Sequence, residues 1–464
     1  MPVRRACSVL VACACAVAGL AGCSSQVGDC SCPARARPEP AYALDVTTKG
    51  RVRWQVPLGP PVTGLPAGLQ VSPVAVGEVA VFAHGGVSAQ AGDVLYGLRL
   101  ADGHRLWSRA TSQPIAGMWR WRHLVAVLTA GSGQQHSVLT GLEASTGRTR
   151  WTLPMDGGAF SQTADGGLVM TVDRDGVSEL EVVDLSSGRV RWTRPVDSDT
   201  VPPVPPVAVR GGAVLFVGGA DGDPDGSLTS YDDRTGQVRW TEALKPASYT
   251  QPPLQVSAGL VYLAADLPAG GQTAGQPAQS EWVLLGISAT DGRVRWRYNP
   301  PGSLDVYASG LMSVITSAYP AGRSLDELDP AAGRVRWHVV SPDQAMATTP
   351  AGIVVTAPGP ESGPAAGTYQ IGVRHTLTGR IRWTVELNEP LAAEPGQTYE
   401  APPALPVFQA GRLLVAPTAS PDDTELLAAL RISNGHRAWQ VTLPGPVEAP
   451  LSSARGGMLI YAGG

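Results

Sequence analysis

An acidic segment in the middle of the chain has the spacing of a calcium-binding loop. Asp221, Asp223 and Asp225 alternate with other residues, a glycine follows, and Asp232 stands at the twelfth position, where such loops usually carry Glu. Hard cations need several oxygen ligands that converge within one turn, and this spacing would supply them. The segment also has the composition of a plain hairpin turn, and a proline inside a calcium loop is unusual. The turn is the favoured interpretation, and a structural calcium ion held by the four aspartates is the alternative.

The other residue types that carry chemistry do not gather into a catalytic motif. The seven histidines show no i,i+4 pair and no cluster, and the sequence has no nucleophile elbow, phosphate-binding loop or zinc signature. Trp119 and Trp121, with Arg120 between them, suggest an aromatic platform for a ligand, although such a pair more often packs between sheets. We therefore predict no catalytic residue.

A phrase of Gly, three residues and Trp recurs nine times and organises most of the chain. Its tryptophans are 41 to 56 residues apart and account for nine of the twelve in the sequence. Repeats of this length are typical of propellers and solenoids. The nine tryptophans are Trp54, Trp107, Trp151, Trp192, Trp240, Trp296, Trp337, Trp383 and Trp439.

The residues around each repeat predict a hairpin. A strand-like segment such as 180–184 leads to a turn that ends in Gly188, and glycine suits a tight turn because it adopts positive φ at little steric cost. The alternating segment that follows should place Val190 and Trp192 on one face of a strand and the neighbouring arginines on the other. A strand, a glycine turn and a second strand precede each hairpin, so each period holds the four antiparallel strands of one propeller blade.

The repeated phrase resembles the tryptophan-docking motif of the pyrroloquinoline-quinone-like (PQQ-like) propeller repeat, and the resemblance covers residues 42 to 462. It implies that the Trp of each outer strand packs between neighbouring blades. The family usually has eight blades, so we expect an all-β propeller of eight four-stranded antiparallel blades. Nine hairpins and a strand pair at 449–461 leave nine blades as the alternative. The N-terminal hairpin should pair with these last strands and so remove exposed sheet edges.

The resemblance leaves two functions open, because the family contains quinone-dependent dehydrogenases and non-catalytic relatives that bind or scaffold. The enzymes hold calcium and the quinone in a central funnel with carboxylates and an Asp base. The expected inner strands bring few acids or histidines to this axis. Asp305 is the first acid to check there, and a solvated residue at a strand end is its favoured interpretation. The inner segments are 71–76, 115–118, 206–209, 254–257 and 405–408.

The N-terminal sequence is typical of a signal for export. Two arginines precede the apolar run 6–20, which is too short to span a membrane and fits a signal peptide. The run ends in Leu-Ala-Gly-Cys23, which resembles a bacterial lipobox and implies acylation of Cys23, so that the lipid holds the protein on a membrane. All six cysteines lie in the first 32 residues, which leaves the later chain without disulfides or thiols. The predicted domains are a signal peptide (1–22), a lipid-anchored tether (23–41) and the propeller (42–464).

Composition and charge limit the classes of partner that we expect the protein to bind. The chain has 464 residues, of which 55 are Gly and 41 are Pro, and its formal net charge is −4, which gives no attraction to nucleic acid. Of the 35 basic residues, 15 lie between a repeat Gly and its Trp, where nearby acids should balance them. Three long segments, 266–280, 357–368 and 388–406, are candidates for a partner-binding face.

These observations predict a non-catalytic binding or scaffolding lipoprotein, exported and anchored at the extracytoplasmic face of the cell membrane. It would engage a protein or another cell-envelope component through the loop faces of the propeller. No cofactor is expected beyond the alternative structural calcium. The alternative function is a pyrroloquinoline-quinone (PQQ)-dependent sugar or alcohol dehydrogenase, and only that function would require the quinone.

Overall fold

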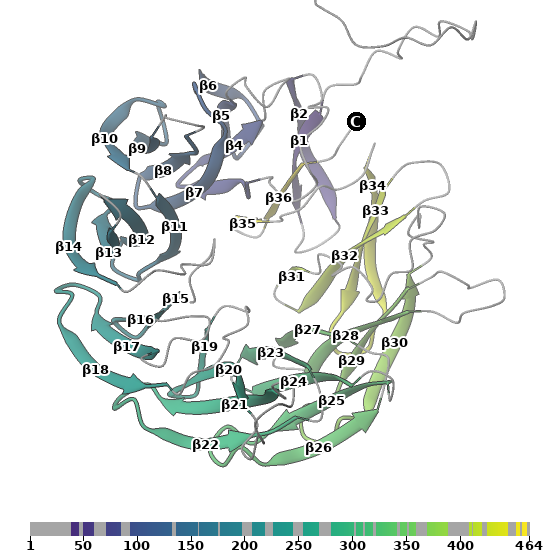
Figure 1. Ribbon diagram of the computed structural model, residues 1–464. Helices are drawn as coiled ribbons and strands as arrows, with labels where there is room; N and C mark the ends of the chain where they lie inside the picture. Colours follow the sequence, from purple (N-terminus) through teal and green to yellow (C-terminus); the bar gives the residue numbers. More distant parts are fainter. Residues whose placement is uncertain are drawn as a thin grey trace, which may run out of the picture. The chain divides into compact units, whose positions relative to one another are not determined.

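The chain folds into β-strands throughout the part that the computed structural model describes. That part comprises residues 39–45, 50–59, 71–84, 93–131, 136–155, 157–174, 177–196, 207–218, 226–244, 254–268, 280–300, 303–309, 311–318, 322–340, 344–349, 352–358, 369–387, 408–410, 412–419, 425–443, 452–454 and 457–461. All of it belongs to one unit, Arg37–Gly464. Its strands form nine four-stranded antiparallel sheets, which are the blades of an all-β propeller (Figure 1). No helix within these residues is long and apolar enough to cross a membrane.

Eight of the sheets contain four consecutive strands each, paired in chain order from a first strand to a fourth. The sheets of the N-terminal half contain β3 (Val74–Val76), β4 (Val79–His84), β5 (Val94–Arg99) and β6 (Arg105–Ala110); β7 (Ile115–Trp121), β8 (Leu124–Thr129), β9 (Ser137–Glu143) and β10 (Thr149–Met155); β11 (Gly157–Gln162), β12 (Gly167–Arg174), β13 (Val177–Asp184) and β14 (Arg189–Pro195); and β15 (Val207–Arg210), β16 (Ala213–Gly218), β17 (Ser227–Asp232) and β18 (Val238–Ala243).

The sheets of the C-terminal half repeat this order. They contain β19 (Gln255–Ser257), β20 (Leu260–Pro268), β21 (Ser280–Ser288) and β22 (Val294–Tyr298); β23 (Ser303–Ser309), β24 (Leu311–Ala318), β25 (Gly322–Leu328) and β26 (Val335–Val340); β27 (Gln344–Thr349), β28 (Gly352–Pro358), β29 (Tyr369–Arg374) and β30 (Ile381–Leu387); and β31 (Phe408–Ala410), β32 (Leu413–Ala419), β33 (Glu425–Arg431) and β34 (Arg437–Leu443).

The ninth sheet joins the two ends of the unit, as the sequence predicts. It pairs β2 (Arg51–Gly59) with β1 (Glu39–Asp45), β1 with β36 (Gly457–Tyr461), and β36 with β35 (Ser452–Ala454). The register of β1 on β36 sets Ala43 opposite Leu459. The expectation of eight blades is wrong because the N-terminal hairpin and the C-terminal strand pair complete one regular sheet. The first strand also begins at Glu39, three residues earlier than the expected start of the propeller.

Each docking Trp lies on a fourth strand, and a β-bulge sets the face to which its side chain points. Val182 pairs with Trp192 and Val183 pairs with Val190, so Arg191 is the extra residue between them. The same register shift precedes the Trp in all nine sheets. Because the bulge breaks the alternation, Trp192 is buried while Val190 is 36% exposed, and the expectation that both share one face is wrong.

The tryptophans join each sheet to the next. The turn glycine Gly188 has a φ of +69°, and a Cβ there would lie 2.5 Å from the indole of Trp151 in the preceding sheet. Trp151 Nε1 also donates a hydrogen bond to the carbonyl of Leu185, at 3.2 Å. The predicted packing of each Trp between blades is therefore confirmed. The nine contacts are Trp54–Gly103, Trp107–Gly147, Trp151–Gly188, Trp192–Gly236, Trp240–Gly292, Trp296–Gly333, Trp337–Gly379, Trp383–Gly435 and Trp439–Gly50.

Candidate binding pocket on the turn face

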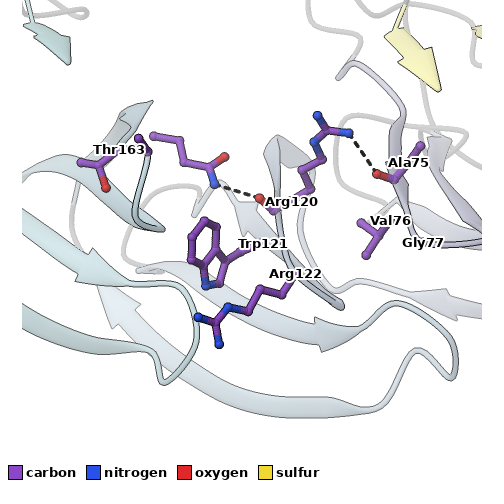
Figure 2. A pocket seen from close by; sticks show the side chains of 9 residues that line it. Ala75, Val76, Gly77, Arg120, Trp121, Arg122 and Thr163 are labelled. Carbon is purple, nitrogen blue, oxygen red and sulfur yellow. Dashed lines mark hydrogen bonds between the residues drawn. The ribbon is translucent and has the colours of Figure 1, made fainter. Parts of the chain in front are cut away.

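The connections between first and second strands, and between third and fourth strands, lie at the same ends of the strands, and we call this side of the propeller the turn face. A pocket of about 460 Å³ opens there between three sheets (Figure 2). We call it the turn pocket. Its lining comes from the ends of β3, β7 and β11 and from the turns that follow them. The lining residues are Ala75, Val76, Gly77, Arg120, Trp121, Arg122, Gln162, Thr163 and Ala164.

Arg120 bridges all three sheets of the pocket. Its Nη1 reaches the carbonyl oxygen of Ala75 on β3, at 3.5 Å, and its backbone carbonyl accepts a hydrogen bond of 2.8 Å from Nε2 of Gln162, the last residue of β11 (Figure 2). The side chain of Arg120 is exposed. The contact with Ala75 directs the guanidinium towards β3, and the contact with Gln162 holds the backbone of Arg120.

The two tryptophans of this strand serve mainly as packing. Both are partly buried against the core between sheets β7–β10 and β11–β14. A Cβ at Gly166 would lie 2.2 Å from the indole of Trp121, so the glycine of the β11–β12 turn makes room for this ring. The blade-interface interpretation of Trp119 and Trp121 is therefore correct, and only Trp121 also lines the pocket.

Arg122 has an unusual backbone conformation. It is the first residue of the β7–β8 turn and has a φ of +53°, in the left-handed region that glycine adopts far more readily than other residues. Its guanidinium lies 5.5 Å from the centre of the Trp121 ring, within reach of a cation–π interaction (Figure 2). An exposed cation on a strained turn thus lines the pocket.

A network of charges braces the far side of the turn pocket. Arg191 binds Asp165 and Asp184, each at 2.9 Å, and Arg234 of the next sheet reaches Asp165 at 3.3 Å. Partial burial raises the pKa of Asp184, but hydrogen bonds from Ser186 and Arg191 outweigh it and lower that pKa to about 2. The network therefore stays ionised near neutral pH and fixes the β11–β12 turn.

A second pocket of about 420 Å³ adjoins this network and shares Ala164 with the turn pocket. It contains Asp232, one of the four aspartates of the predicted calcium loop. Asp232 Oδ1 accepts hydrogen bonds from the backbone N–H groups of Arg234 and Thr235, and Oδ2 pairs with Arg239 at 2.8 Å. Its carboxylate holds the β17–β18 turn. The other three aspartates, Asp221, Asp223 and Asp225, lie outside the described residues.

The other predicted positions are placed only in part. Asp305 lies on β23, a first strand, opposite Ile315 of β24. Cys23 lies outside the described residues, as do most of the three long segments proposed as a partner face. Within the part of the chain that is described, no group of three His, Cys, Asp or Glu side chains could hold a metal ion. We derive no step through a calcium–quinone cofactor.

One turn of the pocket departs from the repeat in sequence, although this departure does not show which turns meet. The segment Trp121-Arg122-His123-Leu124 lacks a glycine at a turn where glycine is expected.

The basic residues before the tryptophans behave as predicted: Arg191, Arg239 and Arg295 each pair with an acid of their own hairpin.

Comparison with known proteins gives one family and several solved structures of low sequence identity. The family model described as "Outer membrane protein assembly factor BamB" matches residues 34–194, 122–246 and 178–358. No curated protein sequence matches the chain. Among solved structures, BamB from Moraxella catarrhalis is 16% identical, covers 86% of this chain and 95% of its own, and has a TM-score of 0.43.

The quinohemoprotein alcohol dehydrogenase from Comamonas testosteroni is 14% identical, covers 83% of this chain and 68% of its own, and also has a TM-score of 0.43. The three family matches together span residues 34–358, well over half of the chain. The chain therefore belongs to the BamB-like family of PQQ-like repeat propellers.

Proposed function

We propose that this chain is a non-catalytic, lipid-anchored binding or scaffolding protein at the extracytoplasmic face of the membrane, and that it binds a protein partner on its turn face. The observation that carries this proposal is the turn pocket, where three sheets present two exposed arginines beside a tryptophan. Arg and Trp are the residue types most enriched at the centres of protein interfaces. The family description, which names an assembly factor, supports a role in contacting other proteins.

The architecture suits such a role, because the pocket sits on turns whose supports are rigid. The β11–β12 turn is fixed by Asp165 and Arg191, and Thr163 Oγ1 accepts a hydrogen bond of 2.7 Å from the backbone N–H of Gly167. Binding residues on loops held by a rigid scaffold lose little conformational entropy when a partner docks.

Site-specific photocrosslinking tests the binding face. A benzoylphenylalanine at Ala164, which is exposed and lines both pockets, should give one discrete protein adduct in intact cells. The matched control is Val177, which is 51% exposed at the start of the third strand β13, at the strand ends opposite the turn face. Equal adducts from both positions, or none from position 164, would count against the proposal.

The anchor is tested separately. Cys23→Ala should move the protein to the soluble fraction or leave its signal peptide unprocessed, because the acyl chains would be lost. Membrane retention of a processed Cys23→Ala protein would contradict a lipid anchor.

The absence of catalysis is tested with the cofactor of the alternative function. Purified protein mixed with PQQ and Ca²⁺ should show neither a stoichiometric complex in its absorbance spectrum nor dye-linked oxidation of sugars or alcohols. A one-to-one quinone complex would favour the dehydrogenase instead.

A further inference from the structure

Arg122 occupies a turn position that is otherwise filled by small residues. In four described sheets, the first and second strands are joined by a two-residue turn whose first residue has positive φ. That residue is Gly77 (φ +60°), Arg122 (+53°), Gly211 (+61°) or Ala258 (+51°). A Cβ at Gly77 or Gly211 would meet nothing within 4 Å, so space does not require glycine there. Glycine at this position relieves the backbone strain of a positive φ, whereas the turn with Arg122 remains strained.

Backbone strain at a surface turn indicates a function when the side chain does not stabilise the fold. The one described contact of the Arg122 guanidinium is the cation–π interaction with Trp121, at an exposed position where it stabilises little. Glycine or alanine at this position would form the same turn, with lower or equal backbone strain, and would not need the cation–π interaction. The strained arginine is therefore explained better by a ligand than by folding.

The charges of the turn pocket are unbalanced, unlike those beside it. Among the described residues, neither Arg120 nor Arg122 forms an ion pair, whereas Arg191 and Arg234 both pair with Asp165. The unpaired pair of cations would attract a negatively charged group, and guanidinium groups bind carboxylates with favourable bidentate geometry.

The directions of the two cations favour a ligand with separated charges. Arg120 points towards Ala75, and Arg122 lies on the other side, by the ring of Trp121 (Figure 2). Ala75, Val76 and Ala164 also line the pocket and add apolar side chains to it. The first strand β3 is also an edge strand of its sheet, and backbone groups at an edge suit a peptide.

We infer that the turn pocket binds an acidic peptide segment of a partner protein, with Arg120 and Arg122 pairing with two separate carboxylates. This inference rests on the proposed function, because it names the chemistry of the partner that the turn face would bind. Arg122 supplies affinity at the expense of the stability of its own turn.

The test uses the purified full chain and fluorescein-labelled hexaglutamate as the probe, followed by fluorescence anisotropy at low ionic strength. Arg122→Gly and Arg120→Ala should each weaken binding about tenfold, the effect of losing one charge-assisted contact. Ala258→Gly is the matched control, because it removes the strain of a positive φ at the same position of the first-to-second-strand turn in another sheet. It should leave the affinity unchanged.

Stability supplies the second readout. Both Arg122→Gly and Ala258→Gly should raise the midpoint of thermal unfolding slightly, by about 1–2 °C, since each removes a strained positive φ. A weaker Arg122→Gly complex therefore cannot be attributed to misfolding. The inference fails if the wild-type chain does not bind hexaglutamate, if Arg122→Gly binds it normally, or if inorganic phosphate displaces it at equal concentration.

The two proposals fail in different ways. Position 164 could still give its protein adduct while Arg122→Gly leaves hexaglutamate binding unchanged. The proposed binding face would then be supported, and the inference of an acidic partner would be wrong. If hexaglutamate binds through Arg122 but no adduct forms at position 164, the pocket is an anion site and the proposed scaffolding role is wrong.

Discussion

The fourth strands of the nine sheets and the turns around the turn pocket follow opposite rules. On the fourth strands, one arrangement is repeated: a bulge, a Trp and the turn glycine of the next sheet. Around the pocket, the turns join first and second strands and differ in sequence, and one of them carries Arg122 where glycine would be less strained. The contrast suggests that the repeated contacts stabilise the propeller, whereas departures from the repeat mark the surface that binds.

The largest effect should follow removal of a docking tryptophan. Trp192 is 7% exposed, stacks on Tyr231 and donates a 3.0 Å hydrogen bond to the carbonyl of Asp233. Trp192→Ala should lower the free energy of unfolding by about 3–5 kcal/mol through lost burial and a cavity. Urea unfolding measures it. Val238→Ala, at an exposed position of the next sheet, should change it by less than about 0.5 kcal/mol.

A pair of glycines separates backbone strain from packing. Gly188 and Gly77 both have positive φ, but a Cβ at Gly188 would lie 2.5 Å from Trp151 and one at Gly77 would meet nothing within 4 Å. Gly77→Ala should cost about 1 kcal/mol for strain alone. Gly188→Ala should cost about 2–4 kcal/mol, because strain and overpacking add. Equal losses in urea unfolding would show that the Trp–Gly contact is not the stabilising feature.

The repeated region could be predicted from the sequence and the pocket could not. The Gly and Trp spacing predicted the hairpins, the four-stranded blades and the closing sheet. It did not reveal the bulge, because an extra residue such as Arg191 looks the same as an alternating one in the sequence. Eight blades were expected from the family rather than from the nine hairpins. The pocket is built by turns from three sheets, and no local pattern shows which turns meet.

One fourth-strand hairpin departs from the common arrangement and provides a smaller, pH-dependent test. The residue opposite the Trp is small or aliphatic in most sheets, but Glu327 lies opposite Trp337. Glu327 is fully buried, neither carboxylate oxygen has a hydrogen bond among the described residues, and Arg336 lies 3.6 Å away. Burial raises the pKa of Glu327 to about 7, and the charge of Arg336 opposes this only in part.

This pKa sets the sign of the pH dependence. Between about pH 4.5 and 7 the folded protein holds the proton that the unfolded chain releases, so the free energy of unfolding contributed by Glu327 falls as pH rises. Glu327→Gln should remove this fall and stabilise the protein by on the order of 2 kcal/mol at pH 8, with little change at pH 4. Unfolding curves at both values measure it, and a variant destabilised at pH 8 would contradict the assignment.

The most direct test of the central claim combines the crosslink with the strained turn. The protein adduct formed from benzoylphenylalanine at position 164 is quantified in intact cells that carry Arg122→Gly or Ala258→Gly at equal expression. The account predicts at least a fivefold loss of adduct with Arg122→Gly and an unchanged yield with Ala258→Gly. Equal yields in the two variants would contradict the claim that a departure from the repeat marks the binding surface.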